Sequence, residues 1–258
     1  MATGILAAKP GIDDFFPDPI LFEGTIFQMN RMVLIRIIAT LALVLIFSIG
    51  AARAKIIPSK GQQLLEMPLL FVRDFVAVNN LGPNTGRKYA PLLTIIFLGV
   101  LFMNITGVIP GLNIAASSVV AVPIVFAVLS YIMFIGAGIK AQGVGKFFKS
   151  QLFPPGVPWP LYIILTPIEA FSTFIVRPAT LVIRLLANML AGHMMMAICF
   201  FGTHYLFFQA TGFVKAAGAL TLAGSIMFVA FEIFVAGLQA FIFTILTTVY
   251  IKMSVQSH

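Results

Sequence analysis

Charged side chains are scarce in this sequence: Asp, Glu, Lys and Arg make up only 9% of its 258 residues. Soluble domains carry about 25% charged residues, so the composition excludes an ordinary soluble domain. Cys199 is the single cysteine, which excludes a disulfide framework and a cysteine-based metal cluster. The histidines, at positions 193, 204 and 258, are too dispersed in the sequence to predict a metal site.

Signatures of nucleotide, nucleic-acid and enzyme chemistry are missing as well. The net charge of +8 rests on 16 Lys and Arg residues, but these are scattered through short loops and form no basic run. There is no Gly-rich phosphate loop, metal-ligand cluster or nucleophilic constellation. We therefore expect no nucleic-acid partner, no cofactor, no metal and no catalytic site in this chain. The N-terminus also lacks a basic region before an apolar one, so we expect no cleavable signal peptide.

Long apolar runs are what the sequence does contain, with 60% hydrophobic residues and a mean hydropathy of +1.06. The composition predicts an all-α polytopic membrane protein with about five membrane-crossing helices, the last two long and strongly tilted. As helices, the apolar stretches 161–202 and 217–250 would be ~63 and ~51 Å long, against a hydrocarbon core of ~30 Å. Either these stretches are broken, with Pro167 and Pro178 as candidates, or they lie steeply tilted.

Charge bias divides the chain into segments with a side of the membrane for each. Basic residues outnumber acidic ones in residues 52–88, so the positive-inside rule places this loop in the cytoplasm and the N-terminus outside. The segments are an extracytoplasmic 1–31, a span at 32–51, a cytoplasmic loop at 52–88, a membrane hairpin at 89–139, a cytoplasmic loop at 140–160, a hairpin at 161–250 and a cytoplasmic tail at 251–258.

The first cytoplasmic loop contains an amphipathic pattern. Gln62, Glu66, Arg73 and Asn80 fall within about 40° of one another on a helical wheel, while most apolar residues lie elsewhere. The pattern predicts a helix lying in the membrane interface and interrupted by Pro68. An ordinary amphipathic loop helix fits the pattern equally well.

Arg184 is the least expected residue, because three apolar residues flank it on each side. An arginine in such a run costs between ~3 and ~15 kcal/mol, and its guanidinium cannot lose its proton to escape that cost. Asn188 and Arg177 share its helical face, whereas His193 points the other way. The small pair at 191–192 would let another helix approach closely. An arginine buried in a membrane span indicates a functional role.

The second long stretch carries Glu232 and Gln239, which share a helical face. If the two stretches form an antiparallel hairpin, His193 and Glu232 fall at comparable depths. Arg184 and Gln239 then lie within about a turn of each other. Glu169 lies on the other, cytoplasmic side of Arg184.

Such a layout suits two half-channels separated by a barrier. Glutamate and histidine can pass protons, whereas a permanently charged guanidinium repels them and favours the ionised form of a carboxylate beside it. This chain offers no carboxylate to be the moving partner of Arg184, so that group would have to come from another subunit. Weaker candidates are Arg177, for which snorkelling is an equally good interpretation, and Asn104, for which an interhelical hydrogen bond is favoured.

These residues fall in motifs that closely resemble subunit a of F-type ATP synthases. The motifs are RPATLVIRLLANMLAGH (177–193) and EIFVAGLQAFIFTILTTVY (232–250), with FMNITGVIP (102–110) in the earlier hairpin. The resemblance covers most of the chain. It implies a stator whose half-channels load and unload carboxylates on a rotating ring of c subunits. Further implied partners are b-type peripheral stalk subunits, the rest of the complex and membrane lipid. The implied location is a bacterial plasma membrane, with an actinobacterial origin suggested by the resemblance.

The resemblance also assigns roles to single positions. Arg184 stands at the family's essential arginine, and Asn188 and Gln239 at its polar neighbours. His193 and Glu232 form the acid–imidazole pair of the outer half-channel, with the two residue types exchanged relative to some members. The resemblance places Glu169 at the cytoplasmic half-channel. It lies nine residues before Pro178, whereas several members have a spacing of eight. Tyr250, at the end of the second motif, is a weaker candidate.

Two other classes of protein remain as alternatives. A self-contained cation or proton secondary transporter could use Glu169, Arg184 and Glu232, but such proteins usually contain internal repeats, and residues 32–139 do not repeat in 161–250. A purely structural anchor would carry costly intramembrane ionisable groups without a use for them.

Overall fold

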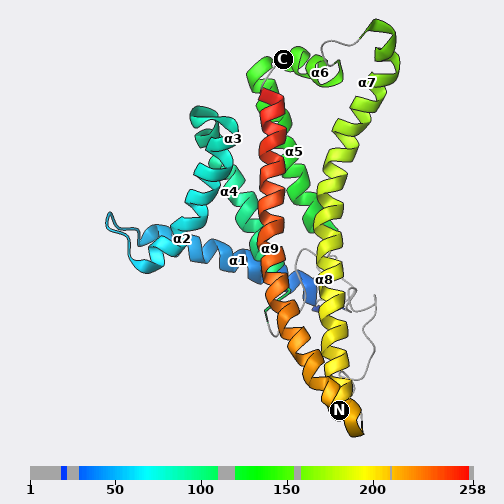
Figure 1. Cartoon of the computed structure of the whole chain (residues 1–258). Helices are drawn as coiled ribbons and strands as arrows, with labels where there is room; N and C mark the ends of the chain where they lie inside the picture. The colour runs from blue at the N-terminus through cyan, green and yellow to red at the C-terminus, as the bar shows by residue number, and fades with distance from the viewer. Residues whose placement is uncertain (1–18, 22–28, 110–119, 154–157, 210, 256–258) are drawn as a thin grey trace.

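The computed structural model consists of helices that follow the apolar stretches of the sequence (Figure 1). The residues it describes are 19–21, 29–109, 120–153, 158–209 and 211–255.

Five helical stretches within the described residues are long and apolar enough to cross a membrane, which confirms the predicted fold class. These stretches are Met32–Ala52, Pro83–Ile105, Ala121–Gln142, Tyr162–Phe208 and Ala217–Val255.

The first span forms helix α1, Arg31–Ala52, close to the predicted bounds of 32–51. The side-chain oxygen of Asn30 caps it by accepting a 3.0 Å hydrogen bond from the backbone N–H of Val33. Ahead of it, strand β1 (Pro19–Leu21) pairs antiparallel with β2 (Met29–Asn30). In Figure 1, α1 crosses behind the two longest helices at a steep angle.

The first cytoplasmic loop of the sequence prediction is largely helical. Helix α2 (Lys60–Leu70) continues into the π-helical segment η2 (Phe71–Val78) and then α3 (Asn79–Leu81). The predicted interruption at Pro68 is wrong, because the helix runs through it and widens into π turns three residues later, one way in which a helix adjusts near a proline. The buried face of η2 consists of Val72, Val76 and Ala77, whereas α2 has no buried residue. A helix in this loop is present, while its place in the membrane interface stays a prediction.

The next span forms helix α4, Pro83–Ile105, which begins well before the predicted start at residue 89. Pro83 suits the first helical position, where its missing N–H has no intrahelical partner to lose. Gly82, at a φ of 79°, makes the turn between α3 and α4. Gly86 then lets α4 lie against η2, since a Cβ there would be only 2.7 Å from the carbonyl oxygen of Ala77.

The third span, which is the second half of the hairpin predicted at 89–139, forms α5, Ala121–Gln142. The loop predicted at 140–160 contains a short helix, α6 (Val144–Leu152), which begins after Gly143, and the turn η4 (Trp159–Leu161).

The predicted apolar stretch from 161 onward is one continuous helical rod. It consists of α7 (Tyr162–Phe171), the π-helical segment η5 (Ser172–Val176) and α8 (Arg177–Phe208). Of the two interpretations left open by the sequence, breakage at Pro167 or Pro178 is therefore wrong. Its 47 residues span ~70 Å, more than twice the hydrocarbon thickness of ~30 Å, so the rod must tilt or extend beyond the bilayer.

The last helix, α9 (Ala217–Val255), follows the short turn η6 (Gly212–Ala216) and returns along α8. It extends further than the predicted end at 250. Helix α9 also packs against α4 and α5, so it lies at the centre of the fold (Figure 1).

Hydrogen bonds tie the C-terminal half of α9 to α5. The hydroxyls of Ser130 and Thr247 are 2.8 Å apart, and both residues are buried. Farther along, the hydroxyl of Ser254 donates to the carbonyl of Phe134 (2.9 Å), and the amide of Gln142 donates to the carbonyl of Ser254 (2.8 Å). Helix α5 therefore holds the end of α9 at two levels.

Candidate ion path along the α8–α9 hairpin

Helices α8 and α9 pack side by side in a defined antiparallel register. The hydroxyls of Thr203 and Ser225 lie 3.4 Å apart near the turn. Higher in the hairpin, Gly192 faces Glu232, since a Cβ on Gly192 would be 2.9 Å from the Oε1 atom of that carboxyl group. The close approach expected at residues 191–192 is thus present, and the helix that approaches is α9.

This register brings the predicted outer-channel residues to similar levels. His193 follows Gly192 and is therefore level with Glu232, as the sequence predicted. Counting along the two antiparallel helices from that contact places Arg184 within about a turn of Gln239. Gln239 is 9% exposed. The structure supports the predicted levels of the residues, while their roles stay predictions.

Glu232 is the most unusual of these groups, because its side chain is buried among apolar neighbours and the residue is only 4% exposed. Its Oε2 atom and the side-chain nitrogen of Asn188 have no hydrogen-bond partner within the described part of the chain. Both residues line a pocket of about 170 Å³ between the two helices, large enough for several water molecules. The other lining residues are Ala191, Gly192, Met195, Phe228, Phe231 and Val235.

Arg184 lies one turn before Asn188 on α8, and its side chain is exposed on the surface of the isolated chain. It forms neither a hydrogen bond nor an ion pair with the described residues. An exposed guanidinium halfway along a helix that spans a membrane needs a partner with a negative charge or water. The structure therefore places Arg184 where an external group could reach it.

Glu169 belongs to a second polar cluster, on the α7 side of Arg184. Its carboxylate accepts a 3.5 Å hydrogen bond from the Nη2 atom of Arg177, and the guanidinium carbon of Arg177 lies 5.7 Å from the centre of the Tyr250 ring. Three of the predicted site residues thus come together at one place. Arg177 is engaged in this cluster, while the choice between a site role and snorkelling to the membrane interface stays a prediction.

The π-helical segment η5 explains how Glu169 and Arg177 can meet. Residues eight apart in a regular α-helix lie about 80° apart around the axis. The wider turns of η5 take up one additional residue, which returns the pair to the same face. This also gives a physical reason for the spacing of nine residues to Pro178, since the additional residue is accommodated without turning Glu169 away.

Tyr131 and Thr173 are parts of this region that sequence reasoning did not identify. The Tyr131 hydroxyl donates a hydrogen bond to the carbonyl of Thr173, which lies in η5. The Thr173 hydroxyl is fully buried and has no partner among the described residues, and neither has the Nη1 atom of Arg177. No local sequence signal marks the π turns that create this polar region.

Asn104 is buried in the last turn of α4, with 1% of its surface exposed. Its neighbour Met103 packs with Leu190 and Met194 of α8 against the start of α1. Asn104 therefore lies near the level of His193, outside the α8–α9 contact itself.

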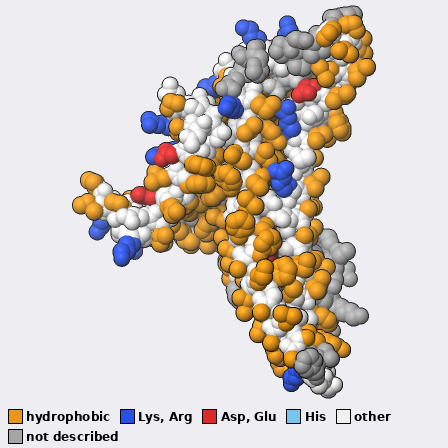
Figure 2. Space-filling view, in the orientation of Figure 1, with side chains coloured by type: hydrophobic (Ala, Val, Ile, Leu, Met, Phe, Trp, Pro, Cys, Tyr) orange, Lys and Arg blue, Asp and Glu red, His pale blue; other side chains and the backbone are white. Residues whose placement is uncertain are grey.

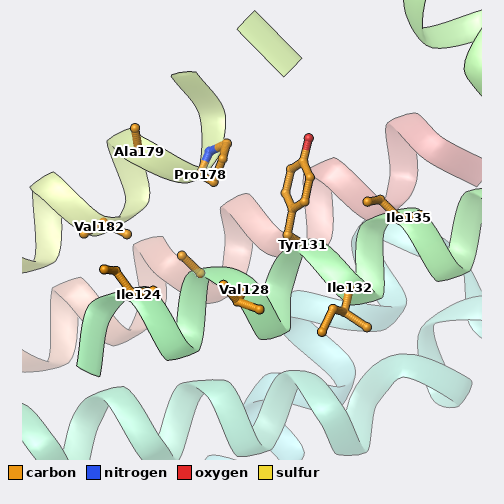
Figure 3. A pocket seen from close by; sticks show the side chains of 9 residues that line it. Ile124, Val128, Tyr131, Ile132, Ile135, Pro178, Ala179 and Val182 are labelled. Atoms are coloured by element: carbon orange, nitrogen blue, oxygen red, sulfur yellow. The ribbon is translucent and has the colours of Figure 1, made fainter. Parts of the chain in front are cut away.

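A second pocket is apolar and lies elsewhere, between α5 and α8 (Figure 3). Its volume is about 350 Å³, and Pro178, Ala179 and Val182 line its α8 side. These residues lie on nearly the opposite side of α8 from Arg184. Tyr131 is the one titratable residue in the lining, and its hydroxyl is bonded to Thr173. We therefore do not assign the ion path to this pocket.

Fold and site together define a multi-pass, all-helical membrane protein with two groups of polar and ionisable residues along the α7–α8 rod and α9. Residues 33–252 match the family described as ATP synthase A chain. The chain belongs to this family, and it is a proton-transporting membrane subunit of an ATP synthase that is not catalytic by itself.

Individual relatives support the same conclusion. ATP synthase subunit a of Rhodococcus erythropolis is 40% identical over 248 residues, which cover 96% of this chain and 90% of that protein. The subunit a of Frankia alni is 42% identical over 224 residues (86% and 76%). That of Streptomyces lividans is 30% identical over 251 residues (97% and 88%). The similarity therefore extends over most of each protein.

The contact between Gly192 and Glu232 leads to a first prediction. We expect Gly192→Ala to fold normally but to slow ATP synthesis by up to about tenfold, equivalent to ~1.4 kcal/mol, because the new methyl group displaces the carboxyl group. Gly202→Ala is the matched control on the same helix, since a Cβ there meets nothing within 4 Å. Synthesis rates in membrane vesicles measure the effect, and equal rates in the two variants would contradict it.

Proposed function

We propose that the α8–α9 hairpin provides two half-channels separated by Arg184, which load and unload the carboxylates of a rotating c-ring. The chain is then the stator of the proton-driven rotor. The observation that carries this proposal is an exposed Arg184 with no ion-pair partner among the described residues, between two separate polar clusters on one hairpin.

In the outer half-channel, protons pass through the pocket between Asn188 and Glu232. The Glu232 carboxyl group is buried beside a pocket that can hold water, and one of its oxygens has no partner among the described residues. We infer that this group accepts and donates the proton there. His193, at the same level, is the second proton carrier, since imidazole changes protonation near neutral pH. Gln239 contributes a polar group nearer to Arg184.

The cytoplasmic half-channel begins at Glu169. The ion pair with Arg177 and the nearby Tyr250 ring fix the direction of this carboxylate. The buried Thr173 hydroxyl, which has no partner among the described residues, provides a further polar group in the same region. This path is separated from the outer pocket by the part of α8 that carries Arg184.

Arg184 is the barrier between the two paths. A guanidinium cannot relay a proton, because it does not deprotonate in proteins, and its positive charge repels a hopping proton. A ring carboxylate that reaches Arg184 is stabilised in its ionised form and must therefore release its proton. Rotation then carries protons from one half-channel to the other.

We propose an extracytoplasmic N-terminus and a cytoplasmic C-terminus in a bacterial plasma membrane. Basic side chains gather along the upper and left margins of Figure 2, near the end of α1, the start of α4, the end of α5 and the end of α9. The turn η6, at the opposite end of the hairpin, carries one basic residue, Lys215. This distribution follows the positive-inside rule.

The experiment that tests the rotor contact is cross-linking in the assembled complex. Ala191 is exposed and lies on the same face of α8 as Arg184, so we expect Ala191→Cys to cross-link to a cysteine placed beside the carboxylate of subunit c. The peripheral stalk, through b-type subunits, and the soluble sector should copurify.

Ile132→Cys is the matched control, because Ile132 is 62% exposed but lines the apolar pocket on the other side of α8. Cross-linking at both positions would show that the reaction does not distinguish the rotor face. If the chain purified alone and conducted protons by itself, the stator hypothesis would be rejected in favour of a self-contained secondary transporter.

A further inference from the structure

The connection between α1 and α2, residues 53–59, carries two isoleucines at its middle that have almost no protein contact. Ile56 is 103% exposed and Ile57 is 85% exposed, more than any other large hydrophobic residue among those described. In Figure 1 this connection is the tip that projects farthest to the left, and Figure 2 shows hydrophobic and basic side chains together there. We call residues 53–60 the α1–α2 tip.

The α1–α2 tip has a defined shape that the side chain of Gln62 maintains. Its amide oxygen accepts a 3.0 Å hydrogen bond from the backbone N–H of Lys55, and its amide nitrogen donates to the carbonyl of Lys55 (3.0 Å). The same nitrogen donates to Glu66 (2.7 Å), and Ser59 caps the start of α2. These bonds hold the isoleucines directed away from the protein, which is costly in water.

Basic residues surround the two isoleucines. Arg53, Lys55 and Lys60 are all exposed, and residues 53–60 contain no acidic residue. The nearest acidic side chain along the chain, Glu66, is engaged by Gln62. The charge of the α1–α2 tip is therefore complementary to an anionic surface.

We propose that the α1–α2 tip is a binding site for anionic phospholipids, with Ile56 and Ile57 inserted at the boundary between headgroups and acyl chains. Helix α1 spans the membrane and ends at Ala52, which brings the tip to the membrane surface at once. There, isoleucine side chains reach the acyl chains while Arg and Lys side chains extend to the phosphates. This inference goes beyond the proposed function and does not depend on the rotor contact.

The test attaches a bimane fluorophore to Ile57→Cys in a Cys199→Ser background, in the assembled complex reconstituted into vesicles. Three quenchers are compared: brominated phosphatidylcholine, brominated phosphatidylglycerol and aqueous iodide. We expect quenching by both brominated lipids, stronger for phosphatidylglycerol, and little quenching by iodide. Each cation at an anionic surface adds a preference of about fivefold. The preference should therefore fall by at least about fivefold when Arg53, Lys55 and Lys60 are all replaced by Gln.

Lys140→Gln, Lys146→Gln and Lys149→Gln together form the matched control, because they remove the same charge from other exposed positions. This control should leave the preference at position 57 unchanged. Strong quenching by iodide alone would overturn the proposal by placing the tip in water. Protection from all three quenchers would overturn it in favour of a protein partner, and equal quenching by both lipids would remove the anionic specificity.

Discussion

Arg184→Ala is expected to abolish proton-driven ATP synthesis while leaving the ATPase activity of the detached soluble sector intact. A unit charge 4 Å from another is worth about 4 kcal/mol at an effective dielectric constant of 20. Its loss corresponds to about a thousandfold in the release of protons from the ring carboxylate. Without the cation, we also expect protons to cross directly between the two proposed half-channels. Synthesis by inverted vesicles under an imposed proton gradient measures the loss.

Arg177→Ala is the matched control for this experiment. It removes the same charge seven residues earlier on the same helix, but from a side chain that is already paired with Glu169. We expect it to slow synthesis and not to eliminate it. Substantial synthesis by Arg184→Ala, or an equal loss in both variants, would refute the special role of Arg184.

Glu232→Ala is expected to slow synthesis by between about ten- and a hundredfold without stopping it, the range for the loss of one positioned proton-transfer group. His193 and water in the pocket can still carry protons, and His193→Ala should have a smaller effect of the same sign. Without the Glu232 carboxyl group to take up protons, the protonation of the ring carboxylates depends directly on the proton concentration outside. The deficit should therefore grow as the outer pH rises from about pH 6 to about pH 9.

Glu66→Ala serves as the control for this variant, because Glu66 is a carboxylate on α2 whose partner is Gln62 and which lies outside the hairpin. Its synthesis rate should follow that of the unmodified chain at every pH. A Glu232→Ala deficit that does not change with the outer pH would count against a role in proton entry.

The relative levels of the hairpin residues were predictable from helical geometry alone. Two long apolar stretches in an antiparallel hairpin fix which residues are level, and the contact of Gly192 with Glu232 agrees with that rule. The small residues at 191–192 were also a local signal that a helix would approach.

What the sequence did not reveal depends on hydrogen bonding within the helices. Prolines at 68 and 167 normally indicate a break, yet in both cases the chain continues and contains π turns a few residues later. Whether a helix breaks or widens depends on tertiary packing, such as that of Val72 and Thr173, which are both fully buried. The pairing of Glu169 with Arg177 follows from those turns and was therefore not predictable from regular helical spacing.

The bonds between α5 and α9 have a mechanical consequence. If the proposed function holds, a rotor turning against Arg184 pushes sideways on the hairpin, and a long helix held at one end alone would bend under that load. Ser130 and Gln142 of α5 form hydrogen bonds with α9 at two separate levels. These bonds restrain sideways movement of the C-terminal half of α9. Under the proposed mechanism, α5 would then pass that force into the rest of the subunit and help to keep the spacing between Arg184 and the ring constant.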